Sequence, residues 1–465
     1  MAARGAAERF MSISLIPLLL MGAGAADAPT QAKDVPTQPA ATSSPTLPAP
    51  PTKPRAASEG GGDDGGGRGR LLRDWGGLRS TLVDAGVTPS LVYTAHTITN
   101  VRGGTQSKLM NAGQFVAGLR FDLDKIADLP GTFQLGIVKR YGESFNQKSG
   151  INALVNPMSI QGRGETYRVS QLWYRTKIGK LDVKLGRMFL NEDFNPGRCD
   201  FISGYFCLGE NTRSNSTIWP TSPVSMWAAR LQYAVRKDVT VKGAVYQYNP
   251  KNLDMERNFY IGWKGATGIV APFEINYTPR FDGKAGNYAI GLFYSNADMN
   301  DPILNSDHQL RAVYGGTPLI RHNEWGAYFN ARQTVRKAAA DGSGRLDLFL
   351  NGSLLSEQST PNNSAIAMGL SYTGLIPGRP RDELGLAFGR GRVNDRITDA
   401  ARYINDNGLG HQPVRTAEYV AEAYYGIGVL PGFTIQPDIQ FIFQPRGDPG
   451  ERNAILLGAR TQVSF

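Results

Sequence analysis

Apolar and polar residues alternate along the last eleven positions of the chain, 455–465. The odd positions are apolar apart from one threonine, whereas the even ones include an arginine, a glutamine and a serine. The same two-residue period runs through 114–124, 417–427 and 433–443. Segments of about 10 residues with one apolar and one polar face are typical of tilted strands that cross a bilayer with lipid on one side and water on the other.

The connections between such segments alternate in length. The short ones lie near residues 127–131, 177–180, 234–238, 277–286, 338–344, 375–382 and 429–432. The generally longer ones are residues 100–110, 143–164, 191–223, 249–268, 296–323, 354–363, 391–414 and 444–451. Seven turns and eight loops join 16 strands, and an even count brings both ends of the barrel to the periplasmic side. We therefore predict an all-β fold, a 16-stranded antiparallel transmembrane β-barrel, because a soluble repeat such as a propeller gives no reason for this rhythm.

Composition and charge exclude several other classes of protein. The chain has no run of about 18 apolar residues, which excludes a helical membrane protein but permits a barrel. The formal net charge is +10, yet no basic run or nucleic-acid motif is present, so a nucleic-acid partner is not expected. The positive charge is expected in a lumen and around its rims. The four histidines are scattered and have no ligand spacing, so neither a metal nor another cofactor is predicted.

The amino-terminal part divides into three segments before the barrel. Residues 1–25 have basic residues, a short apolar run and small residues near Ala23, which predicts a cleaved secretory signal peptide. Residues 26–70 are rich in Pro, Ala and Gly, which predicts a disordered tether. Residues 71–86 predict a short periplasmic helix that Asp74 caps and Gly86 ends. The barrel itself is predicted over residues 87–465.

Three segments resemble the carbohydrate-selective porin (OprB-type) family of Gram-negative outer membranes. They are DWGGLR from Asp74, GLIPGRPRD from Gly374 to Asp382, and IQPDIQ from Ile435 followed by GDP at 447–449 and the last strand. Their order, and their spacing to the terminal Phe465, make the resemblance specific over residues 71–465. It implies a 16-stranded pore in the outer membrane that admits glucose and similar sugars by passive diffusion. The tether is longer than the resemblance leads us to expect.

The longest loop is the candidate constriction. Residues 191–223 follow the fifth strand, and in general porins the loop at this position folds into the lumen. Cys199 and Cys207 are the only cysteines, and in an exported protein such a close pair predicts a disulfide. The disulfide could staple an inward-folded loop or only stiffen an extracellular one. The candidates on this loop are Asp193, Arg198, Asp200, Glu210, Arg213 and Trp219.

The polar faces of the predicted strands supply candidates for the pore wall. A path that selects sugars needs donors and acceptors that replace lost water, and aromatic faces for the sugar rings. The candidates are Arg120, Asp122, Arg140, Gln171, Trp173, Arg175, Arg230, Lys242, Glu274, Glu418 and Glu422. The three on the fourth strand face inward if Leu172 and Tyr174 face lipid.

The interpretation from sequence is a passive sugar porin. The first alternative is a general or anion-preferring solute porin on the same barrel, which the basic charge suggests. An enzyme is not expected, because the chain has no Gly-x-Ser-x-Gly and no histidine near a suitable nucleophile. Expected partners are sugars, outer-membrane lipids and lipopolysaccharide, and the barrel-assembly machinery, for which Phe465 is the candidate signal. Monomer and trimer both remain open.

Overall fold

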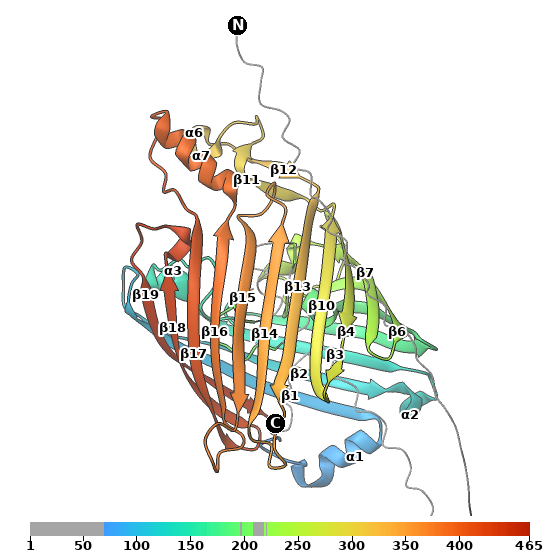
Figure 1. Ribbon diagram of the computed structural model, residues 1–465. Coiled ribbons are helices and arrows are strands. Elements are labelled where there is room, and N and C mark those ends of the chain that lie inside the picture. The colour runs from blue at the N-terminus through green and yellow to red at the C-terminus, as the bar shows by residue number, and fades with distance from the viewer. Residues whose placement is uncertain (1–68, 163, 196–197, 208–217, 220) are drawn as a thin grey trace, which may run out of the picture. The chain divides into compact units, whose positions relative to one another are not determined.

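A computed structural model describes residues 69–162, 164–195, 198–207, 218–219 and 221–465. The signal-peptide prediction and almost all of the predicted tether lie outside these residues. The described part forms a closed antiparallel barrel in which each strand pairs with its neighbours in the chain and β1 pairs with β19 (Figure 1). The sixteen barrel strands are β1 (Val87–Arg102), β2 (Leu109–Asp122), β3 (Thr132–Gly142), β4 (Tyr167–Ile178), β5 (Leu181–Met188), β6 (Met226–Arg236), β7 (Val239–Tyr248), β8 (Gly268–Tyr277), β10 (Lys284–Ser295), β13 (Glu324–Arg336), β14 (Arg345–Leu355), β15 (Asn362–Thr373), β16 (Glu383–Val393), β17 (Ala417–Leu430), β18 (Phe433–Phe443) and β19 (Ala454–Ser464). The predicted fold and strand number are confirmed.

The connections keep the predicted rhythm of short turns and longer loops. The connection between β4 and β5 is residues 179–180, whereas the next one, between β5 and β6, is residues 189–225. Three small strands lie outside the barrel count: β9 (Arg280–Phe281) in a turn, and β11 (Met299–Asn305) with β12 (Pro318–Arg321) in a long loop. Figure 1 shows α1 and the carboxy terminus at one end of the barrel and the β11–β12 hairpin at the other.

Short helices occupy the turns and loops. They are η1 (Trp75–Gly77), α1 (Leu78–Asp84), α2 (Leu123–Ala127), α3 (Phe145–Ser149), α4 (Leu190–Asp193), η2 (Pro250–Leu253), α6 (Arg311–Tyr314), α7 (Asp395–Asp406) and η3 (Pro445–Gly447). None of the helices in the described part of the chain is long and apolar enough to cross a membrane. The strand pattern assigned to 114–124 ends at Asp122, because the next residues turn into α2.

The predicted amino-terminal helix is present but shorter than its predicted span of 71–86. The Asp74 carboxylate accepts hydrogen bonds from the backbone N–H and the hydroxyl of Ser80, at 2.8 Å each, and so caps the first turn of α1. After the helix, Gly86 has a φ of +86°, which only glycine adopts without strain. A Cβ there would also lie 2.9 Å from a side-chain carbon of Ile126. Gly86 therefore ends the helix as predicted and lets the chain turn into β1.

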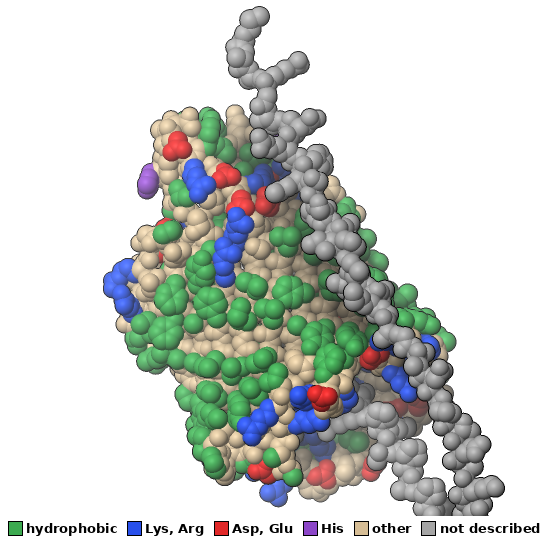
Figure 2. All heavy atoms as spheres, viewed as in Figure 1, with side chains coloured by type: hydrophobic (Ala, Val, Ile, Leu, Met, Phe, Trp, Pro, Cys, Tyr) green, Lys and Arg blue, Asp and Glu red, His purple; other side chains and the backbone are tan. Residues whose placement is uncertain are grey.

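The two faces of β18 have the predicted character. On β18, Gln436 and Gln440 are buried, whereas Ile435 and Phe443 are exposed. Figure 2 shows hydrophobic side chains forming a band across the barrel wall, with Lys, Arg, Asp and Glu gathered toward its two ends. An exposed apolar belt of this kind has no favourable contact with water and matches the hydrocarbon layer of a membrane.

Candidate permeation path

The loop between β5 and β6 packs against inner-wall side chains from opposite sides of the barrel. Phe201, together with the adjacent segment of the loop, lies in a buried cluster with Tyr424 of β17. Phe194 and Trp219 lie in a second buried cluster, where Trp219 packs against Phe293 and Tyr328. Burying one large apolar side chain stabilises the fold by roughly 1.5–3 kcal/mol. The described part of the loop therefore lies inside the barrel and narrows the lumen.

An ion-pair network on the β4–β8 side fixes the start of this loop. Its cations are Arg175, Lys184, Arg230 and Lys242, and its carboxylates are Asp182, Glu192, Asp193 and Glu274. The Lys184 ammonium lies 2.7 Å from a Glu192 oxygen and 3.0 Å from an Asp193 oxygen. Four positive and four negative groups pair with one another there, away from water. Charges are tolerated in a protein interior when they are paired in this way.

The two loop carboxyls of this network differ in their pKa. Burial raises the pKa of Glu192 to about 7, although Lys184 opposes the rise. Burial also acts to raise the pKa of Asp193, but there the ion pairs with Lys184 and Arg230 outweigh it and lower the pKa. Asp193 is therefore the ionised anchor of the network, whereas Glu192 is the group that gains a proton near neutral pH.

Two carboxylates on β17 hold the loops by their backbone. Glu418 accepts the N–H of Leu154 at 2.9 Å and that of Arg446 at 2.8 Å. Glu422 accepts the N–H of Ile202 at 2.6 Å and that of Ser203 at 3.1 Å. Both side chains are fully buried. Glu418 and Glu422 therefore hold the loops inside the barrel. Their carboxylate oxygens bind groups of the protein itself.

The Cys199–Cys207 disulfide is present and lies on the inner side of the barrel. The Arg460 guanidinium of β19 donates to the carbonyl oxygen of Cys199 at 2.6 Å, and Gln436 of β18 donates to that of Asp200 at 2.8 Å. The disulfide bond closes the small ring, and side chains of the wall fix the ring by binding its main-chain oxygens.

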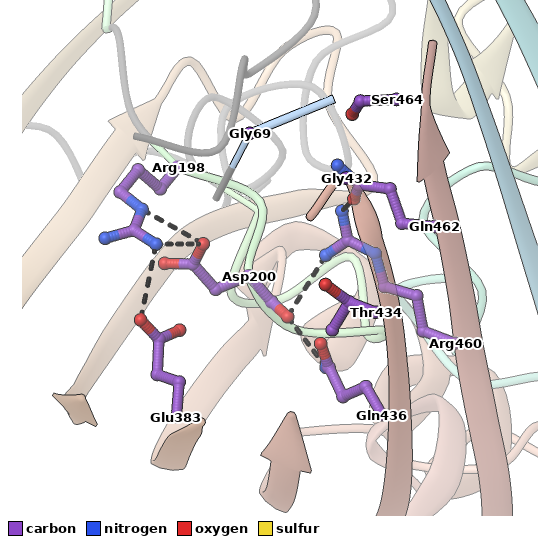
Figure 3. A pocket seen from close by; sticks show the side chains of 10 residues that line it. All are labelled: Gly69, Arg198, Asp200, Glu383, Gly432, Thr434, Gln436, Arg460, Gln462 and Ser464. Atoms are coloured by element: carbon purple, nitrogen blue, oxygen red, sulfur yellow. Dashed lines mark hydrogen bonds and ion pairs between the residues drawn. The ribbon is translucent and has the colours of Figure 1, made fainter. Parts of the chain in front are cut away.

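Two cavities mark the open path beside this ring. One lies against Arg198, Asp200, Glu383 and Arg460, and Figure 3 shows Arg198 bridging the carboxylates of Asp200 and Glu383. The other has polar lining groups, which include Thr94, His96, Gln114, Arg140, Gln171 and Asn191. Arg198, Arg460 and Gln462 line both cavities. The two cavities therefore adjoin at these three side chains, beside the disulfide ring.

The sequence-predicted residues fall into four groups. Arg140, Gln171, Arg198 and Asp200 line the cavities, whereas Trp173, Arg175, Arg230, Lys242, Glu274, Glu418, Glu422, Asp193 and Trp219 are engaged in the networks and clusters that hold the loops. Arg120 and Asp122 lie at the turn end of β2, where Arg120 donates to Gln134. Glu210 and Arg213 lie outside the described residues. A role for any of them in sugar passage stays a prediction.

Arg460, His96 and Gln114 were missed as site residues by the sequence reasoning. Arg460 was on the polar face of the closing strand, so the alternation of that strand could have identified it. His96 is absent from the predicted set, because a histidine without ligand spacing predicts no metal site and gives no other signal in the sequence. No pattern within one strand could show that β19, β1, β2 and β3 bring these side chains into one cavity.

The carboxy terminus is tied to the amino-terminal helix. The Phe465 N–H donates to the Leu91 carbonyl at 3.0 Å, and Arg79 of α1 donates to the Phe465 carbonyl at 3.1 Å. Arg79 also donates to the Pro89 carbonyl at 2.7 Å. The residues before β1 thus cover the seam at which the barrel closes. The role of Phe465 as an assembly signal stays a prediction.

Comparison with known proteins agrees with this architecture. The chain is 32% identical over 413 residues to Porin B of Pseudomonas aeruginosa, covering 85% of this chain and 91% of that protein. A high-pH structure of Pseudomonas putida OprB matches with a TM-score of 0.80 and 29% identity, covering 88% of this chain and all of that one. A low-pH structure of the same protein matches with a TM-score of 0.55 and 25% identity, covering 85% and 98% of the two chains. The family model for the carbohydrate-selective porin, OprB family, matches residues 106–465, so this chain belongs to that family.

Proposed function

We propose that this protein lets glucose and similar sugars cross the outer membrane by passive, carbohydrate-selective diffusion through the lumen of the barrel. The observation that carries the proposal is the pair of cavities beside the disulfide ring, where amide, hydroxyl and guanidinium groups line the wall. These groups replace the hydrogen bonds that a sugar loses when it leaves bulk water. Passage also requires weak binding, so that the sugar leaves again.

The proposed process needs no cofactor, covalent intermediate or energy source. The family and the fold are those of channels and not of enzymes. The family places the protein in the outer membrane of a Gram-negative bacterium. Export through a cleaved signal peptide, contacts with lipid and lipopolysaccharide, and insertion by the barrel-assembly machinery are parts of the proposal. Either a monomer or a trimer is compatible with it.

Liposome swelling tests the proposal directly. The refolded protein is inserted into vesicles, and swelling is followed in isosmotic glucose and in a neutral non-sugar of equal size, with protein-free vesicles as the control. We expect glucose to enter faster than the non-sugar. Equal rates for the two solutes would contradict carbohydrate selectivity.

The second candidate function is a general or anion-preferring porin. The observation that favours it is the presence of Arg140, Arg198 and Arg460 on the walls of the path. Reversal potentials in a salt gradient separate the two candidates, because an anion-preferring pore gives a potential set by chloride. If anions dominate and glucose enters no faster than the non-sugar, this second function replaces the first.

A further inference from the structure

Four polar side chains form an arc on the inner wall, across β19, β1, β2 and β3. In strand order they are Arg460, His96, Gln114 and Arg140. His96 lies directly opposite Arg460 in the pairing of β1 with β19, and Gln114 lies directly opposite Arg140 in the pairing of β2 with β3. All four line one cavity. We call them the guanidinium arc.

His96 is the unusual member of the arc. Its side chain is only 1% exposed, and neither ring nitrogen has a hydrogen-bond partner among the described residues. A buried polar group without a partner costs about 1–3 kcal/mol, and buried groups in native proteins are nearly always satisfied by protein, water or ligand. The residue opposite it on β2 is Ala112, which adds no polar atom. The ring is therefore suited to meet a group that enters the cavity.

The two guanidinium groups flank this ring in defined positions. Arg140 donates to the Gln114 amide oxygen at 3.1 Å, and Arg460 donates to the carbonyl oxygen of Cys199 at 2.6 Å. Both arginines interact electrostatically with His96. A fixed, planar guanidinium binds a carboxylate in preference to a neutral oxygen, because each of its N–H bonds is then charge-assisted.

We propose that the guanidinium arc is a binding site for carboxylated sugars and polyols, of which gluconate is the simplest example. The carboxylate binds at Arg140 and Arg460, and a neighbouring hydroxyl bonds to His96. Gln114 keeps Arg140 in place. This proposal rests on the proposed function in one respect, that solutes pass through this cavity. It adds a substrate class that neutral-sugar passage does not require.

Block of single-channel current tests the site with the full-length protein and at constant ionic strength. Sodium gluconate is the probe. Sorbitol has the hydroxyls without the carboxylate, acetate has the carboxylate without the hydroxyls, and glucose is the neutral sugar. We expect gluconate to reach half-block at a concentration at least tenfold lower than each of the other three. Equal block by glucose, or equal block by acetate, overturns the proposal, the latter showing general attraction of anions.

Variants assign the effect to the arc. Arg140→Gln and His96→Leu are each expected to raise the half-block concentration of gluconate at least fivefold and that of glucose less than twofold. Arg390→Gln is the matched control, because it removes the same charge from an exposed position on β16. The assignment is overturned if the half-block concentrations of gluconate and glucose shift equally. It is also overturned if neither Arg140→Gln nor His96→Leu shifts the half-block concentration of gluconate. Swelling in glucose is recorded in parallel, so that a failure of sugar passage is distinguished from a failure of this site.

Discussion

The inner wall of β5–β8 and the inner wall of β17 both hold loop segments inside the barrel, but with different groups. On β5–β8 the loop contributes its own carboxylates, and Asp193 pairs with Lys184 and Arg230. On β17 the wall contributes the carboxylates, and backbone N–H groups of the loops donate to Glu418 and Glu422. The first wall therefore holds the loop through charged loop side chains, whereas the second holds it through backbone N–H groups and through apolar packing such as that of Phe201 on Tyr424.

This difference shows what the inward-facing charges do. On both walls the acidic side chains are buried and bound to the protein, so they fix the shape of the lumen. The side chains that line the cavities are mainly arginines, amides and hydroxyls. We therefore propose that shape and selectivity depend on largely separate sets of residues, and the predictions below test that separation.

The largest effect is expected from Asp193→Asn. The substitution keeps the shape of the side chain but removes its charge, which leaves Lys184 and Arg230 with less compensation in a buried site. Removing one partner of a buried ion pair costs about 3–5 kcal/mol. We expect the free energy of unfolding in denaturant, followed by tryptophan fluorescence in lipid vesicles, to fall by that amount.

Asp399→Asn is the control for this prediction. Asp399 pairs with Arg402 on the surface of α7, and the two side chains are 70% and 57% exposed. An exposed pair of this kind contributes less than about 1 kcal/mol. If both variants lose the same free energy, the β5–β8 network is not the support that its burial suggests.

The pKa of Glu192 predicts that the stability of the β5–β8 wall depends on pH. The pKa is raised to about 7 in the folded protein, above the value of 4.5 for a free glutamate. The folded state therefore binds the proton more tightly. Its contribution to stability is complete below pH 4.5 and is lost as the pH rises through about 7, by up to roughly 3 kcal/mol.

Glu192→Gln isolates this contribution. The variant keeps an acceptor for Lys184 and cannot ionise, so we expect the difference in free energy of unfolding between the wild type and the variant to change by that amount between pH 5 and pH 8. The wild type is expected to lose stability relative to the variant as the pH rises. A constant difference would mean that the Glu192 carboxyl is already ionised at pH 5.

The fold could be predicted from the sequence because its information is local. Alternation such as that of residues 433–443 indicates which side chains face lipid. The length of each connection indicates at which end of the barrel that connection lies. The position of the constriction loop followed from its length and from Cys199 and Cys207. A single periodic signal, repeated along the chain, was enough to give the number of strands and their faces.

The site could be predicted only in part because its contacts are not local. The alternation correctly turned Glu418 and Glu422 inward, but nothing in the sequence shows that backbone N–H groups of Leu154 and Ile202 occupy them. Those partners are 264 and 220 residues away. Strand faces identify which residues are inside, whereas the path of the loops decides which of them a solute reaches.

The smallest effect is expected from Glu422→Gln, on the wall that binds backbone groups. The glutamine oxygen still accepts one N–H, from Ile202 or Ser203, but its amide nitrogen faces the other and leaves it without an acceptor. Such a loss costs about 1–3 kcal/mol, less than the loss of a buried ion-pair partner. Because Ile202 directly follows Phe201, which packs in the lumen, we also expect open-channel current noise to increase. Glu143→Gln is the control, because Glu143 is 60% exposed and forms a surface ion pair with Lys148. A loss as large as that of Asp193→Asn would show that the two walls depend equally on charge.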